Sequence, residues 1–181
     1  MYHTAGRSRT NSPERVGLDS YYAAVWLGEE FAVKKSGKSD PTIIYLRWCK
    51  DIQDGLIQSD YKHAPLIHCL IEHDKGYYVV LKKYKKAKER PVGHILEMLK
   101  PFTAYLEQQG LPLAMNQKNG YVVPIGKQVK TFGFFFRYDL HSENYMVDPD
   151  DGRLVITDPL AGNYHEPSVY DLPLFKPGQR V

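Results

Sequence analysis

The sequence contains only two cysteines, Cys49 and Cys69, and it has no long uninterrupted apolar segment. Two thiols do not supply the framework of a small disulfide-stabilised secreted domain, so both are expected to be reduced. No apolar run approaches the ~20 residues that span a bilayer, and residues 1–7 lack the apolar core of a signal peptide. We therefore expect a cytoplasmic protein without a membrane partner.

The sequence also lacks a strong excess of charge of either sign. Its 24 Lys and Arg residues and 21 Asp and Glu residues give a formal net charge of +3. Because this imbalance is small, we expect no nucleic-acid partner. The 181 residues are 43% hydrophobic and 25% charged, which is typical of a globular chain and excludes disorder throughout. One domain, or two small lobes around a cleft, fits this length.

The most informative stretch is a predicted hairpin over residues 145–157, in which an Asp-Pro-Asp-Asp-Gly turn separates two short apolar strands. If the turn is centred near Asp151, residues whose numbers sum to about 302 face each other. This register places Asn144 beside Asp158 at the open end. Asp139 lies on the loop that enters the hairpin, so we expect a second carboxylate nearby.

Asn144, Asp158 and Asp139 have the side chains that phosphoryl transfer needs. A carboxylate and an amide oxygen can share one Mg²⁺ on the phosphates of ATP, and these are the roles predicted for Asp158 and Asn144. The second carboxylate, Asp139, would orient the acceptor hydroxyl and accept its proton. The alternative is a structural hairpin, since loop aspartates are commonly turn residues.

The run from Tyr138 to Met146, Tyr-Asp-Leu-His-Ser-Glu-Asn-Tyr-Met, and Ile-Thr-Asp-Pro at 156–159 resemble the catalytic loop and metal-binding Asp of protein kinases. They are most similar to the early serine/threonine kinases of podoviruses related to the T-odd coliphages. This resemblance implies a phage-encoded, Mg²⁺- and ATP-dependent kinase that acts on host proteins in the host cytoplasm. His141, two places after Asp139, also resembles aminoglycoside phosphotransferases, and it is predicted to donate a hydrogen bond to the transferred phosphoryl group.

Residues 31–34, Phe-Ala-Val-Lys, resemble the Val-Ala-Ile-Lys strand of kinases. The period of a strand puts Ala32 and Lys34 on one face, where a small residue leaves room for the base and the lysine reaches the phosphates. Where kinases carry a glycine-rich loop, the preceding segment retains one glycine, Gly17, so fewer backbone N–H groups can approach the phosphates. Ser20 and Tyr21 are predicted to cover the nucleotide instead.

A helix is predicted from Asp40, as N-cap, to near Gly55, with Pro41 in its first turn. Its apolar stripe should pack it on the sheet, in the place of the kinase regulatory helix. The interior lacks a Glu to pair with Lys34, and Arg47 stands there instead. Either another acid orients Lys34, or ATP binding and turnover are impaired.

The expected fold class is α+β: a minimal bilobal kinase-like fold with an antiparallel-sheet N-lobe carrying one helix and a truncated, mainly helical C-lobe. The predicted organisation is a flexible tail over 1–14, an N-lobe over 15–83 and a reduced C-lobe over 84–181. An amphipathic helix over 92–109 should be kinked or split by Pro101.

Three functions remain open. The first is the protein kinase. The second is a catalytically weak or inactive kinase-like protein that binds and inhibits a host factor, supported by the missing glycines, the missing helix acid and the short second lobe. The third is a small-molecule phosphotransferase, suggested by His141.

The lysine-rich segment 82–91 is predicted to connect the lobes and to meet the adenine edge of the nucleotide. The alternative for this segment is a docking patch for an acidic protein or RNA.

Overall fold

The computed structural model describes these residues: 14–15, 23–88, 92–109, 113–116, 121–124, 136–139 and 141–162. Most of the predicted tail lies outside this set, and the predicted domain bounds stay predictions. Among the described residues, none of the helices has the length and apolar character that crossing a membrane requires.

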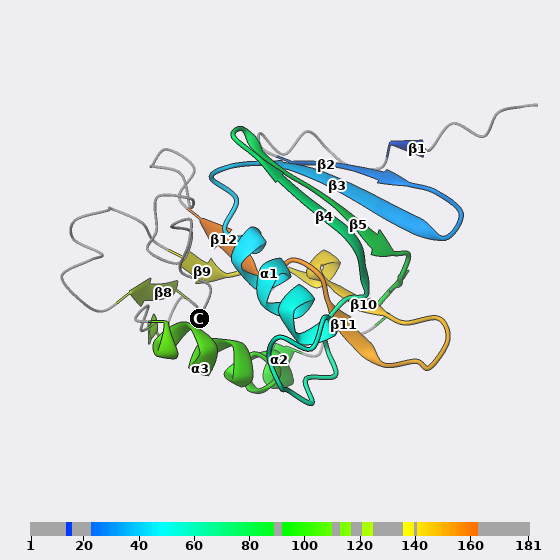
Figure 1. The fold of residues 1–181 in the computed structure, drawn as a ribbon. Coiled ribbons are helices and arrows are strands. Elements are labelled where there is room, and N and C mark those ends of the chain that lie inside the picture. The colour runs from blue at the N-terminus through cyan, green and yellow to red at the C-terminus, as the bar shows by residue number, and fades with distance from the viewer. Residues whose placement is uncertain are drawn as a thin grey trace, which may run out of the picture.

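The N-terminal part of the chain forms a five-stranded antiparallel sheet in the order β1-β2-β3-β5-β4 (Figure 1). Its strands are β1 (Glu14–Arg15), β2 (Ala23–Leu27), β3 (Phe31–Gly37), β4 (Ile67–His73) and β5 (Gly76–Lys82). Along β3, Lys34 and Ser36 are buried, whereas Lys35 between them is exposed. This alternation is the one that the period of a strand predicts.

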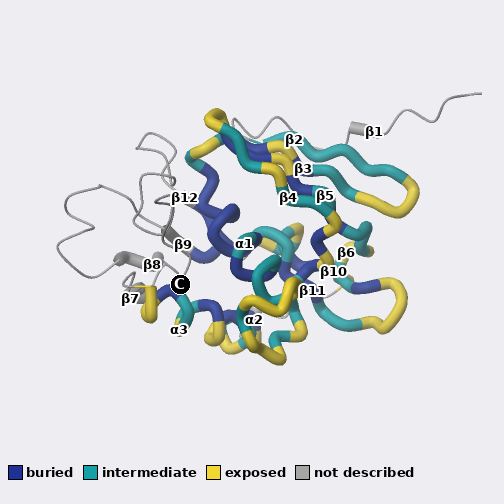
Figure 2. The backbone as a smooth tube through the Cα atoms, in the orientation of Figure 1, coloured by how far each residue is buried: buried dark blue, intermediate teal, exposed yellow. Residues whose placement is uncertain are grey.

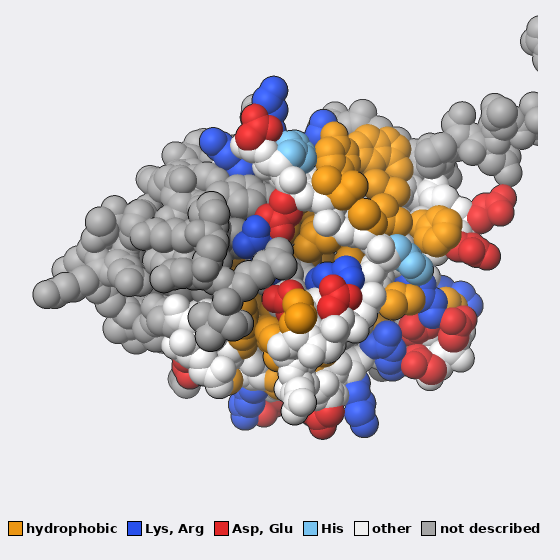
Figure 3. Space-filling view, viewed as in Figure 1, with side chains coloured by type: hydrophobic (Ala, Val, Ile, Leu, Met, Phe, Trp, Pro, Cys, Tyr) orange, Lys and Arg blue, Asp and Glu red, His pale blue; other side chains and the backbone are white. Residues whose placement is uncertain are grey.

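The sheet presents hydrophobic side chains to solvent as well as to the core. The exposed ones include Phe31, Ile71 and Tyr78. Figure 3 shows hydrophobic side chains gathered over the sheet.

Gly76 opens β5 with a φ of 146°, and a Cβ atom there would lie 2.0 Å from the carbonyl oxygen of Ser36. The absence of a side chain at Gly76 therefore allows the start of β5 to lie close to Ser36 and Gly37 at the end of β3.

One helix, α1 (Thr42–Gln53), packs beneath this sheet (Figure 1). The prediction of Asp40 as its N-cap is wrong by one residue, because the N-cap is Pro41. Asp40 nevertheless accepts a hydrogen bond from the Thr42 amide at 2.9 Å, so its carboxylate still satisfies a free N–H of the first turn. Arg47 of α1 forms an ion pair with Glu72 of β4.

The other described residues form two more α-helices, a short 3₁₀ turn and two small antiparallel sheets. Helices α2 (Val92–Met98) and α3 (Lys100–Gln108) replace the single predicted helix, and Pro101 lies in the first turn of α3. The predicted split at Pro101 is confirmed, since proline is tolerated at the start of a helix and not in its interior.

The two sheets have the orders β11-β10-β6 and β12-β9-β8-β7. Their strands are β6 (Lys85–Lys86), β7 (Leu113–Asn116), β8 (Tyr121–Pro124), β9 (Phe136–Tyr138), β10 (Tyr145–Val147), β11 (Leu154–Ile156) and β12 (Leu160–Gly162). The 3₁₀ turn is η1 (Ser142–Asn144). The predicted fold class, α+β with one helix on an N-terminal antiparallel sheet, is confirmed. In the described part of residues 84–181, seven short strands accompany α2 and α3, which the expectation of a mainly helical C-lobe did not include.

The core lies between the sheet, α1 and α3 (Figure 2). Phe102 of α3 is fully buried, and its ring centroid lies 5.2 Å from that of Tyr45 and 5.2 Å from that of Trp48, both on α1. Each such aromatic pair adds about 0.5–1.5 kcal/mol beyond area burial. The Tyr45 hydroxyl also donates to the Ile156 carbonyl of β11 at 3.2 Å. Helix α1 is therefore fixed to both α3 and β11.

Phe102→Ala should lower the free energy of unfolding by about 3–5 kcal/mol, because a large buried ring leaves a cavity against α1. Urea denaturation followed by circular dichroism measures the change. Leu56→Ala is the control: Leu56 is 67% exposed. Surface substitutions of this kind stay within about 0.5 kcal/mol. Equal effects of the two substitutions would contradict the packing of α3 on α1.

Candidate functional site

Lys34 lies at the centre of a charge cluster beneath the sheet. Its Nζ is 2.6 Å from Oδ2 of Asp158 and 3.0 Å from Oδ2 of Asp40. The Lys34 side chain is 11% exposed, so both ion pairs are largely shielded from water. Burial opposes the charged form, but Asp158 and Asp40 outweigh it and raise the pKa of Lys34 well above its ordinary value. The two carboxylates therefore stabilise the charged form of Lys34.

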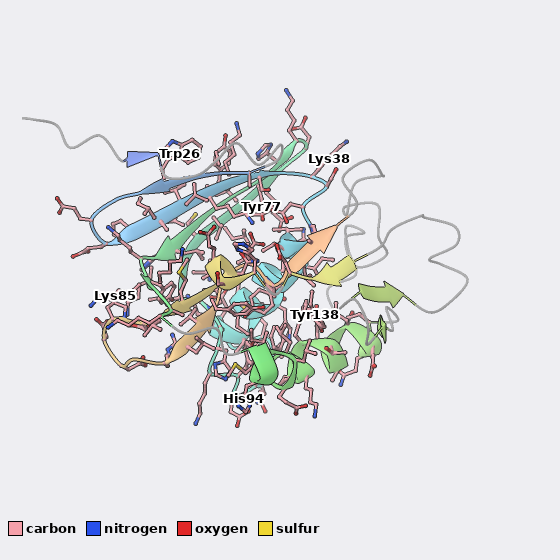
Figure 4. The ribbon with its side chains drawn as sticks, turned by 180° about the vertical axis from the view of Figure 1, so that it is seen from behind. Trp26, Lys38, Tyr77, Lys85, His94 and Tyr138 are labelled. Atoms are coloured by element: carbon pink, nitrogen blue, oxygen red, sulfur yellow. The ribbon has the colours of Figure 1, made fainter. Side chains whose placement is uncertain are left out.

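Asp40 supplies the acid that is missing from the helix interior. Its Oδ2 accepts hydrogen bonds from Ser36 Oγ at 2.6 Å and Tyr77 Oη at 2.7 Å, in addition to facing Lys34. Tyr77 lies on β5 and is labelled in Figure 4. Burial alone would raise the pKa of Asp40, but Lys34 and the hydrogen-bond donors together lower it. Asp40 is therefore held as a carboxylate.

Sequence reasoning missed this role because Asp-Pro before an apolar helix is the ordinary signal of a helix start. The two oxygens of Asp40 have different partners: Oδ1 accepts a hydrogen bond from the Thr42 amide, and Oδ2 forms the ion pair with Lys34. The sequence left two alternatives: another acid orients Lys34, or ATP binding and turnover are impaired. The structure places another acid, Asp40, beside Lys34. Arg47 has its own partner, Glu72.

Asp158 reaches Lys34 from the other end of the described chain. Besides the contact of its Oδ2 with Lys34, its Oδ1 accepts a hydrogen bond from the hydroxyl of Thr42. The Asp158 side chain is 33% exposed, against 9% for Asp40, so it is the carboxylate of the cluster that a ligand can reach. Burial raises the pKa of Asp158; Lys34 opposes this rise and Asp40 adds to it.

Asp139 is brought toward Asp158 by strand pairing. Strands β9 and β12 are antiparallel, with Tyr138 opposite Leu160. The Asp139 N–H continues this pairing by donating to the Pro159 carbonyl at 2.8 Å. The predicted base therefore lies across from the residue that follows Asp158.

The predicted hairpin is present, but its predicted register is wrong by one residue. Tyr145 pairs with Ile156, and Asn144 therefore faces Thr157, whose N–H donates to the Asn144 carbonyl at 2.9 Å, and not Asp158. The turn is centred earlier than Asp151 because Asp148 closes it with a 2.9 Å hydrogen bond from its N–H to the Arg153 carbonyl. Turn geometry sets the register of a hairpin.

Asn144 and His141 both bind the loop that carries Asp139. Asn144 Nδ2 donates to the Asp139 carbonyl at 3.1 Å. The His141 N–H donates to Asp139 Oδ1 at 3.3 Å, which helps to orient the carboxylate. His141 Nδ1 accepts from the Glu143 amide at 3.4 Å, so the proton of the neutral ring lies on Nε2. The His141 side chain is 62% exposed, which leaves this donor accessible.

The remaining predicted site residues are Ala32, Gly17 and Ser20. Ala32 lies on β3, opposite the buried Leu81 of β5 and two positions before Lys34. Gly17 and Ser20 lie outside the described residues.

Asp158 of the cluster and Asn144, which faces the preceding residue Thr157, carry oxygen atoms of the kind that Mg²⁺ takes as ligands. In the part of the chain that the structure describes, no group of three or more His, Cys, Asp or Glu residues is arranged to hold a metal ion. Mg²⁺ sites in nucleotide enzymes commonly use one or two protein oxygens, with phosphate and water oxygens as the other ligands. The partly exposed Asp158 carboxylate and the Asn144 amide oxygen are donors of this kind.

No protein-family model matches the chain, and no curated protein matches it. Among solved structures it is similar to Rad53 1-466 in complex with AMP-PNP, with a TM-score of 0.39, 18% identity, and coverage of 80% of this chain and 36% of that chain. It is also similar to the 2.2 Å resolution crystal structure of WbdD, with a TM-score of 0.39 and 16% identity. This match covers 82% of this chain and 32% of that chain. Another structure of WbdD, described as a bifunctional kinase-methyltransferase, has a TM-score of 0.34 and 17% identity. The match covers 81% of this chain and 31% of that chain. The chain spans about a third of the length of these structures.

Asp40→Asn should lower the free energy of unfolding by about 1–3 kcal/mol, because buried donors lose a charged acceptor while Lys34 keeps Asp158. Urea denaturation measures the change. Asp54→Asn is the matched control, since Asp54 pairs with Lys50 on the surface of α1 and is 43% exposed. The control should change stability by less than about 0.5 kcal/mol. If the two variants are equally stable, the buried pair with Lys34 is not a real feature of the fold.

Proposed function

We propose that this chain is a kinase-like enzyme that transfers the γ-phosphate of Mg²⁺-ATP to serine and threonine hydroxyls of proteins. The observation that carries the proposal is the position of Lys34 Nζ, 2.6 Å from Asp158 and 3.0 Å from Asp40. A strand lysine held by an acid and facing a metal-binding aspartate is the arrangement that kinases use on ATP. Asp139, directly after strand β9, which pairs with β12, adds a carboxylate for the acceptor.

In this proposal Asp158 and Asn144 hold Mg²⁺, which when bound neutralises charge on the phosphates. Lys34 binds the phosphates with an ammonium already fixed by Asp40, so little reorganisation accompanies the reaction. Asp139 orients the acceptor hydroxyl and accepts its proton. His141 donates Nε2–H to the transferred group. Most of the catalysis is positioning and charge neutralisation.

Serine/threonine specificity, phage origin and host-protein acceptors in the host cytoplasm belong to the same proposal. Their support is the resemblance of residues 138–146 and 156–159 to early podoviral kinases. Phosphoamino-acid analysis of labelled products tests the specificity: phosphoserine and phosphothreonine are expected, and phosphotyrosine alone would contradict it.

Asp139→Asn should reduce phosphate transfer by at least about 100-fold, because the acceptor loses the group that takes its proton. Incorporation of label from γ-labelled ATP into the proteins of a cell lysate measures the rate. Asp151→Asn, in the hairpin turn and 56% exposed, is the matched control and should remain active. Wild-type transfer by Asp139→Asn would remove Asp139 from the mechanism.

Asp158→Asn should abolish the stabilisation of the protein by Mg²⁺-ATP, because the accessible carboxylate for the metal is lost. In the wild type, ligand at 100 times its Kd adds about 2.7 kcal/mol to the free energy of unfolding. A thermal-shift titration of ATP, with Mg²⁺ and with EDTA, measures this.

The same titration separates the alternatives. A wild-type protein that is neither stabilised by millimolar Mg²⁺-ATP nor able to transfer label would favour the inactive protein that binds a host factor. Transfer to an aminoglycoside and to no protein would identify the small-molecule phosphotransferase.

A further inference from the structure

Thr42 contacts both carboxylates that flank Lys34. It is the first residue of α1 and is fully buried. Its amide donates to Asp40 Oδ1 at 2.9 Å, and its hydroxyl donates to Asp158 Oδ1. No step of the proposed phosphotransfer assigns a role to this residue.

The Thr42 hydroxyl has a choice of two acceptors. Besides Asp158 Oδ1, the Leu160 carbonyl oxygen lies 3.2 Å from Thr42 Oγ1. A hydroxyl has one proton, and a charged acceptor forms the stronger bond, so the carboxylate receives it. Leu160 remains as an acceptor if Asp158 Oδ1 turns to another ligand.

The consequence for Asp158 is that both of its oxygens are held. Lys34 donates to Oδ2 and Thr42 donates to Oδ1. Two donors from different elements, β3 and α1, fix the plane of one carboxylate. Because this carboxylate is the accessible member of the cluster, its orientation decides where a cation can bind.

We propose that Thr42 is a positioning residue for the metal site, whose hydroxyl orients the Asp158 carboxylate for Mg²⁺. The proposal rests on the phosphotransferase function, because Asp158 is a metal ligand only in that function. Thr42 touches neither nucleotide nor acceptor in this role. It acts through Asp158 and prepares the site in the same way that outer hydrogen-bond partners orient metal ligands elsewhere.

The test compares Thr42→Val, which keeps the shape and loses the hydroxyl, with Thr42→Ser, which keeps the hydroxyl. The Mg²⁺ concentration for half-maximal effect is measured at fixed ATP, by thermal shift and by the rate of phosphate transfer. Thr42→Val should raise it about tenfold, the typical loss for one hydrogen bond to a charged group. Thr42→Ser should stay within about threefold of the wild type, because serine retains the donor.

Thr103→Val is the matched control. Thr103 is on α3, where its hydroxyl contacts the Leu99 carbonyl at 3.1 Å and the Tyr138 hydroxyl and neither Asp158 nor Asp40, so the substitution removes a partly buried hydroxyl away from the predicted metal ligands. It should leave the Mg²⁺ dependence unchanged. If Thr42→Val does not fold, Thr42→Ala removes the same hydroxyl without a branched side chain.

Each outcome decides the proposal. A rise in Thr42→Val with rescue in Thr42→Ser supports it. Unchanged Mg²⁺ dependence in Thr42→Val overturns it, as does an equal rise in Thr42→Ser, since the hydroxyl would then not be the cause. If the wild type shows no Mg²⁺-dependent nucleotide effect, the phosphotransferase function fails and the role of Thr42 fails with it. The wild-type titration therefore separates failure of the function from failure of this inference.

Discussion

A buried ammonium group needs buried counter-charges, and this need determines how the chain is arranged around Lys34. Removing a cation from water costs several kcal/mol, which only well-placed opposite charges offset. Lys34 obtains them from Asp40 at 3.0 Å and Asp158 at 2.6 Å. These residues come from the turn after β3 and from the loop after β11. One charge therefore joins the sheet to a loop that lies more than a hundred residues later in the chain.

The polar groups around this cluster keep its charges fixed. Burial, with the Asp40 carboxylate adding to it, raises the pKa of Tyr77 well above its ordinary value, so its hydroxyl remains a neutral donor. Ser36 donates to the same oxygen of Asp40 at 2.6 Å. Both donors lie on strands of the sheet. The charges are therefore oriented by rigid elements before a ligand binds, which is the condition for electrostatic catalysis.

Local patterns predicted much of this site, and tertiary contacts explain what they missed. Strand alternation placed Lys34 inward correctly, and Pro101 divided the predicted helix where expected, because both features depend on neighbouring residues. The hairpin register failed by one residue because closure of the turn by Asp148 and Arg153 is not visible in an apolar pattern. Strand alternation could also have predicted that Ser36 is buried beside Lys34, since it lies two positions later on the same face.

The roles of Asp40 and Thr42 could not be read from local sequence, because each is also an ordinary helix-start residue. Their positions change what α1 contributes to the site. Kinases place the acid that pairs with the lysine inside the helix. Here the acid precedes the helix and accepts hydrogen bonds from Ser36 and Tyr77 on two strands and from the Thr42 amide at the start of α1.

Helix α1 also holds Asp158, the carboxylate that we propose as a metal ligand. Thr42 at its start binds Asp158, and Tyr45, one turn later, donates to the carbonyl of Ile156, two residues before Asp158, at 3.2 Å. Two contacts one turn apart on the helix thus fix two points of the strand end that carries Asp158. Because Phe102 packs against Tyr45 from below, α3 supports the same connection. Helix α1 thus links the packing of α3 to Asp158, and its first residue also binds Asp40, which accepts further hydrogen bonds from Ser36 and Tyr77 of the sheet.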